Sequence, residues 1–188
     1  MTTKVIVLLM CGAASVACAQ GKPAASAAGP SAAEAAKPTP PADASQWLTY
    51  DPATSTATLK LVAGAPGAKS PFNFDGYTDG GAALVVPPKT KVVINFVNED
   101  GTPHSAEVIA DKDPMPNIGG DPAIPAAYTK DVTQGLPQFG KDVIGFTAPD
   151  QGSYRIFCGV PGHGLSGMWI RFTVDPAAKT ASFGPTKR

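Results

Sequence analysis

The segment Tyr154-Arg-Ile-Phe-Cys-Gly-Val-Pro-Gly-His-Gly-Leu-Ser-Gly-Met-Trp-Ile-Arg-Phe-Thr-Val174 joins two runs of alternating residues through a glycine-rich loop. Successive side chains of a β-strand point to opposite faces, so each run predicts a strand with one buried face. The loop carries Cys158, His163 and Met168 in the spacing Cys-x4-His-x4-Met. The segment therefore predicts a β-protein with sulfur and nitrogen donors at one end of a sheet.

These donors predict a metal site. The chain has two histidines, His163 and His104, and the second lies in a Pro-His-Ser turn. One thiolate, two imidazoles and a thioether form the ligand set of a mononuclear type 1 copper site, in which a weak axial Met completes a His2Cys plane. We predict one copper ion that alternates between Cu(I) and Cu(II), with the ligands His104, Cys158, His163 and Met168.

Each of these residues also has a structural interpretation when it is taken singly. A lone Cys or Met often fills a core, and a lone His is more often structural than a ligand. Met115 is a rival axial ligand, but it lacks the loop spacing of Met168. The conjunction of Cys158, His163 and Met168 in one loop favours the copper site.

Three motifs carry a family resemblance. They are Phe72-Asn-Phe-Asp-Gly-Tyr77, Pro103-His-Ser105, and the loop Cys158–His163 followed by Gly167-Met-Trp169. Together they resemble a sulfocyanin-type cupredoxin from Trp47 to Asp175. The resemblance implies a β-sandwich electron carrier with redox protein partners, a cytochrome or a terminal oxidase, in a respiratory chain.

The family's ligand pattern falls on the four predicted ligands without a substitution. In many cupredoxins an Asn after the first His hydrogen-bonds across to the Cys loop. Ser105 stands there in this chain, and we expect it to make the same link with a shorter reach. Such partners of the ligands hold them in place and tune the metal.

The N-terminus predicts an export signal at residues 1–19. Lys4 precedes a short apolar run that is too short to span a membrane comfortably, and Ala17-Cys-Ala19 matches an Ala-x-Ala cleavage site. The alternative is a lipoprotein, because Ser15-Val-Ala-Cys18 resembles a lipobox. We expect export to a bacterial periplasm, with membrane attachment only if Cys18 is lipidated.

After export, Cys158 would be the one cysteine left unmodified, because Cys11 lies inside the signal and Cys18 is either removed or lipidated. No internal disulfide could then form. A solitary thiol in an oxidising compartment calls for a function, and metal ligation supplies one.

The remaining chain divides by composition. We expect a disordered Ala/Pro-rich linker at 20–45, a cupredoxin domain at 46–176 and a frayed C-terminal tail at 177–188. The predicted fold is all-β, a cupredoxin-like Greek-key sandwich of about eight strands. The expected extended segments are 56–62, 72–77, 82–86, 90–98, 104–110, 143–147, 153–158 and 168–174. Within 72–77, the Asp75-Gly76 step suggests a turn or bulge. The irregular segment 111–142 would pack over the sandwich or flank the copper end.

Several function classes do not fit. The 15 basic and 15 acidic residues balance, and no basic run suggests nucleic acid. Two histidines cannot build a trinuclear copper cluster, one loop cysteine cannot build a dinuclear site, and Met is a poor zinc ligand. We expect a monomeric one-electron carrier that is not an enzyme. Copper delivery or storage is the alternative, and its signature would be several exposed Met and His residues.

Overall fold

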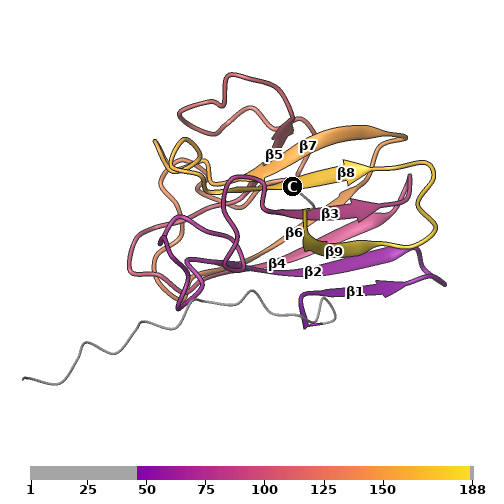
Figure 1. Cartoon of the computed structure of the whole chain (residues 1–188), viewed down its shortest axis with the longest axis horizontal. Helices are drawn as coiled ribbons and strands as arrows, with labels where there is room; N and C mark the ends of the chain where they lie inside the picture. The colour runs from indigo at the N-terminus through magenta and orange to yellow at the C-terminus, as the bar shows by residue number, and fades with distance from the viewer. Residues whose placement is uncertain (1–45, 187–188) are drawn as a thin grey trace, which may run out of the picture. The chain divides into compact units, whose positions relative to one another are not determined.

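Nine β-strands in two sheets form the regular structure of residues 46–186, the part of the chain that the computed structural model describes (Figure 1). The strands are β1 Leu48–Asp51, β2 Thr56–Ala63, β3 Ala82–Val86, β4 Lys91–Asn98, β5 Glu107–Ala110, β6 Lys141–Thr147, β7 Gly152–Phe157, β8 Trp169–Val174 and β9 Ser182–Pro185. No α-helix occurs within residues 46–186, and in this range no helix could cross a membrane. The predicted all-β fold is confirmed.

The two sheets lie one above the other in Figure 1. One has the order β1-β2-β4-β6 and the other β5-β7-β8-β3-β9. From β3 to β7 each strand lies in the opposite sheet from the one before it, so the chain crosses repeatedly between the layers. As a result β2 pairs in parallel with β4, and β3 pairs in parallel with β8.

The core fills the space between the sheets, as the alternation of apolar residues predicts. On β4, Val92, Ile94 and Phe96 are buried. The same pattern on β8 buries Ile170, Phe172 and Val174. Each large apolar side chain contributes roughly 1.5–3 kcal/mol when it is fully buried. Both sheets are thus fixed in register by their inward faces.

Two sequence expectations need correction, and a third is met in part. The segment Phe72–Tyr77 contains the turn that its Asp-Gly step suggests, and in place of a strand it has isolated bridges, because Phe74 pairs with Ala63 and with Tyr77. The strand expected from 104 begins only at Glu107. The frayed tail is wrong for residues 182–185, which form β9 beside β3.

The predicted signal peptide 1–19, with its alternative lipid site at Cys18, and the linker 20–45 lie outside the described residues.

The irregular segment 111–142 flanks the predicted ligand loop. Gly119 N–H donates to the Gly159 carbonyl at 2.9 Å, and Gly162 N–H donates to the Asn117 carbonyl at 2.8 Å. Further along, Leu136 forms a bridge with His104. The segment therefore supports the end of the sandwich where the predicted ligands gather.

Candidate metal centre

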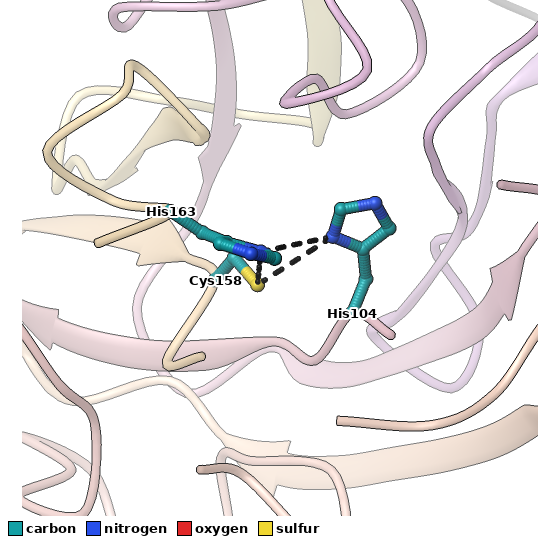
Figure 2. A group of neighbouring side chains, drawn as sticks. All are labelled: His104, Cys158 and His163. Atoms are coloured by element: carbon teal, nitrogen blue, oxygen red, sulfur yellow. Dashed lines mark hydrogen bonds between the residues drawn. The ribbon is translucent and has the colours of Figure 1, made fainter. Parts of the chain in front are cut away.

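Two separate parts of the chain bring three of the predicted ligands together. His104 follows the turn after β4, Cys158 comes directly after β7, and His163 lies in the loop between β7 and β8. Figure 2 shows the three side chains facing one another. Their exposed fractions are 0%, 0% and 9%, so the cluster is shielded from bulk water except at the edge of His163.

The donor atoms are spaced as ligands of one ion would be. His104 Nδ1 lies 3.2 Å from His163 Nδ1, and Cys158 Sγ lies 3.5 Å from His163 Nδ1 and 3.9 Å from His104 Nδ1. Metal bonds of about 2.0 Å to nitrogen and about 2.3 Å to sulfur, set at about 120°, would place the two nitrogens about 3.5 Å apart and each nitrogen about 3.7 Å from the sulfur. The observed spacing fits a trigonal plane of these three donors.

Met168 ends the same loop, and its backbone is fixed to the other two loop positions. Cys158 N–H donates to the Met168 carbonyl at 3.0 Å, and Met168 N–H donates to the His163 carbonyl at 3.1 Å. The Met168 side chain is fully buried. The loop thus folds back so that its first and last predicted ligands are neighbours.

Gly167 permits this return of the chain. Its φ is +92°, in the left-handed region that favours glycine, and an added Cβ would lie 2.7 Å from a carboxylate oxygen of Asp79. Asp79 N–H also donates to the Gly167 carbonyl at 2.8 Å. The turn before Met168 is therefore packed tightly against a neighbouring turn.

Ser105 connects three segments around the thiol. Its hydroxyl accepts from Gly159 N–H at 3.0 Å and donates to the Val132 carbonyl at 2.6 Å. Its backbone N–H points at Cys158 Sγ over 3.4 Å. The expected link to the Cys loop is confirmed, and it extends to the irregular segment through Val132.

The protonation of the cluster follows from its burial. Burial raises the pKa of the Cys158 thiol, although hydrogen bonds from the backbone of Ser105 and Val160 oppose the shift. Burial lowers the pKa of His104 and of His163, so both imidazoles are favoured in the neutral form that ligates metals. A metal ion would replace the thiol proton.

Two residues of the site escaped the analysis of the sequence. Phe72 packs on both imidazoles, with its ring centroid 4.7 Å from that of His163 and 6.3 Å from that of His104. Asp100 Oδ2 lies 3.1 Å from His104 Nε2. Phe72 belongs to a family motif, but its contact depends on a turn that periodicity does not predict. Asp100 offers no signal beyond an acidic residue in a turn.

Residues 43–182 match the family model described as the sulfocyanin (SoxE) domain. The chain belongs to the sulfocyanin family. Sulfocyanins are blue copper proteins of the cupredoxin type and act in electron transfer, so the resemblance in the three sequence motifs is confirmed.

Individual relatives are distant. Sulfocyanin from Sulfolobus acidocaldarius is 28% identical over 127 residues, and the alignment covers 64% of this chain and 64% of the relative. The alignment therefore spans just under two thirds of that protein.

Solved structures of two other proteins are similar as well. The copper protein rusticyanin is 25% identical with a TM-score of 0.49, over 69% of this chain and 89% of its own. Rusticyanin from Thiobacillus ferrooxidans is 26% identical with a TM-score of 0.47, and the match covers 64% of this chain and 82% of its own. Auracyanin B is 24% identical with a TM-score of 0.46, and the match covers 63% of this chain and 88% of its own.

Proposed function

We propose that this sulfocyanin-family protein is a one-electron carrier that binds one copper ion through His104, Cys158 and His163. Met168 would be the weak axial ligand. The observation that carries the proposal is the convergence of two imidazole nitrogens and one thiol sulfur, 3.2 to 3.9 Å apart, in a buried cluster. When bound, copper supplies the redox chemistry by alternating between Cu(I) and Cu(II).

The surrounding chain keeps the ligands still. Ser105 fixes the Cys158 loop to the irregular segment, and the backbone bonds between Cys158, His163 and Met168 fix the loop to itself. Burial excludes water from the donors. A site whose donors are held in one arrangement moves little when its charge changes by one, and this favours rapid electron transfer.

The surface beside His163 is suited to a brief encounter with a redox partner. Glycines 162 and 164 flank the imidazole, and the neighbouring Leu165 is 59% exposed. Weak electron-transfer complexes use small interfaces. We propose docking of a cytochrome or a terminal oxidase at this loop, in line with the partners that the family resemblance implies.

The setting is a further part of the proposal. Residues 1–19 have the composition of an export signal, so we propose a periplasmic location. We further propose that the protein is a monomer and works as an electron carrier, not as an enzyme. Cys18 is either removed or lipidated. Mass spectrometry of the mature N-terminus distinguishes a chain that begins at Gln20 from one that carries lipid on Cys18.

Spectroscopy of the copper-loaded protein tests the metal site. Oxidised protein should show an intense visible absorption that a reductant bleaches, together with the paramagnetic resonance signal of a type 1 site. Cys158→Ser should remove the colour and leave the fold intact by circular dichroism. A Cys158→Ser variant that keeps the colour would show that Cys158 is not a copper ligand.

The same preparation tests the alternative of copper delivery or storage. For a carrier of electrons, Cu(I) should stay bound when a metal-free acceptor protein is added. Rapid transfer of Cu(I) to that acceptor would favour the delivery role.

A further inference from the structure

His104 has a polar partner on the side of its ring that faces away from the cluster. Its Nδ1 faces Cys158 and His163, whereas its Nε2 lies 3.1 Å from Asp100 Oδ2. We propose that Asp100 is a positioning residue, which holds His104 in the tautomer with the proton on Nε2 and the lone pair of Nδ1 free for the metal. The role of that lone pair rests on the proposed copper site.

The chemistry of the pair determines the tautomer. An ionised carboxylate can only accept hydrogen bonds, and a neutral imidazole has one donor and one acceptor nitrogen. The contact with Asp100 therefore places the proton of His104 on Nε2. Nδ1 is then the acceptor, and it faces the other two donors of the cluster.

The carboxylate is itself held in place. Thr102 N–H donates to Asp100 Oδ2 at 3.2 Å, and Asp100 N–H donates to Asn98 Oδ1 at 2.9 Å. The buried Asn98 amide donates in turn to the carbonyls of Thr102, at 2.8 Å, and Leu136, at 2.9 Å. The turn that presents the carboxylate is thus held by hydrogen bonds among the protein's own groups.

The same network fixes the backbone of the ligand. His104 N–H donates to the Leu136 carbonyl at 3.2 Å, and Leu136 N–H donates to the His104 carbonyl at 2.7 Å. Asn98 binds that same Leu136 carbonyl, so one set of bonds controls both the main chain of His104 and the carboxylate at its ring. Gly64 packs against this turn, since a side chain at that position would collide with Asp100.

The two imidazoles differ in this respect. Among residues 46–186, the hydrogen-bond contact of an imidazole with a carboxylate is that of His104 with Asp100. The ring of His163 instead contacts Phe72 and the cluster itself. His104 is therefore the ligand whose orientation and basicity a carboxylate controls.

A carboxylate beside a ligand affects both affinity and potential. Loss of such outer partners typically weakens metal binding about 10–100-fold. The negative charge favours Cu(II) over Cu(I), so its removal should raise the reduction potential. For a one-electron couple, each tenfold loss in Cu(II) affinity relative to Cu(I) corresponds to about 59 mV.

Three variants test the assignment. Asp100→Ala removes the acceptor and the charge, whereas Asp100→Asn removes the charge and keeps an acceptor oxygen. Asp150→Asn is the matched control, because it removes the same charge from an exposed pair with Lys89 in the turn between β6 and β7.

The first measurement needs no metal. Nitrogen-15 resonances of the metal-free protein, recorded above the His pKa range, report which ring nitrogen carries the proton. Wild type and the Asp150→Asn control should show the proton of His104 on Nε2, and Asp100→Ala should show a mixture of tautomers.

The second measurement is copper binding by competition with chelators, in both oxidation states. Cu(II) affinity should fall about 10–100-fold in Asp100→Ala and less in Asp100→Asn. The Cu(II) affinity of Asp150→Asn should equal that of wild type. The reduction potential should rise most in Asp100→Ala, less in Asp100→Asn and not at all in Asp150→Asn.

An Nε2 proton that persists in Asp100→Ala, together with copper affinities equal to those of the control, would overturn the assignment. If Asp100→Ala does not fold, the near-isosteric Asp100→Asn decides through its potential, which must exceed that of the control. Failure of the copper site itself looks different, because wild type would then bind no copper while the tautomer still depended on Asp100.

Discussion

Replacement of Ser105 by Ala should destabilise the metal-free protein because two hydrogen bonds are lost. The Ser105 hydroxyl accepts a hydrogen bond from Gly159 N–H at 3.0 Å and donates one to the Val132 carbonyl at 2.6 Å. Ser105 and Gly159 are buried, and Val132 is half-buried. Alanine fills nearly the same volume, so the change leaves two backbone groups without a partner and creates little cavity.

The magnitude follows from these two groups. A buried donor left unsatisfied costs about 1–3 kcal/mol, and a hydrogen bond at a half-buried carbonyl contributes about 1 kcal/mol. The sum is about 2–4 kcal/mol, out of a total of about 5–15 kcal/mol for a typical domain. At about 2–4 °C per kcal/mol for a chain of this size, the melting temperature should fall by about 4–16 °C.

Urea unfolding of the metal-free protein, followed by circular dichroism, measures the change. The midpoint should fall at a constant slope, which indicates lost stability and not an altered denatured state. Ser153→Ala is the control, because Ser153 is exposed on β7, and it should change stability by no more than about 0.5 kcal/mol. Equal losses in the two variants would refute the bridging role of Ser105.

Three more changes test other parts of the molecule. Burial raises the pKa of Asp75, so the native state should lose stability as pH rises from about 4 through that raised pKa. In Asp75→Asn, the free energy of unfolding from urea titrations at several pH values should no longer fall over this range. Wild-type and variant curves of stability against pH that run parallel would contradict this. Met168→Leu should keep the colour of copper-loaded protein and raise its potential, whereas an unchanged potential would remove Met168 as axial ligand. Phe183→Ala should lower the free energy of unfolding by about 3–5 kcal/mol if β9 is part of the core, against little change for the exposed Ser182→Ala.

The parts of the fold that local patterns control were predictable. The alternation of Ile170, Phe172 and Val174 predicted β8 and its buried face, and the alternation at 92–97 predicted β4. The loop spacing predicted that Cys158 and His163 would meet, because two residues only five positions apart in a glycine-rich loop stay close together in space. His104 was matched to them by elimination and by resemblance.

The parts that depend on distant neighbours were not predictable. β9 reads Ser-Phe-Gly-Pro and has one large apolar residue, so its pairing depends on the neighbouring β3 and not on its own pattern. Asp100 meets His104 through a turn whose shape is fixed by Asn98 and Leu136, two residues far apart in sequence. The predicted domain boundaries stay predictions, because the segment 1–45 lies outside the described residues.

Cys158 exposes none of its surface, and burial raises the pKa of its thiol. Peroxide and foreign disulfides attack the thiolate, and they need access to it. A newly made chain that has folded but has not yet met its ion is therefore protected from oxidative damage at the one position it cannot replace. Its lifetime before loading should depend on how often the end of the sandwich opens, as well as on the oxidant concentration outside.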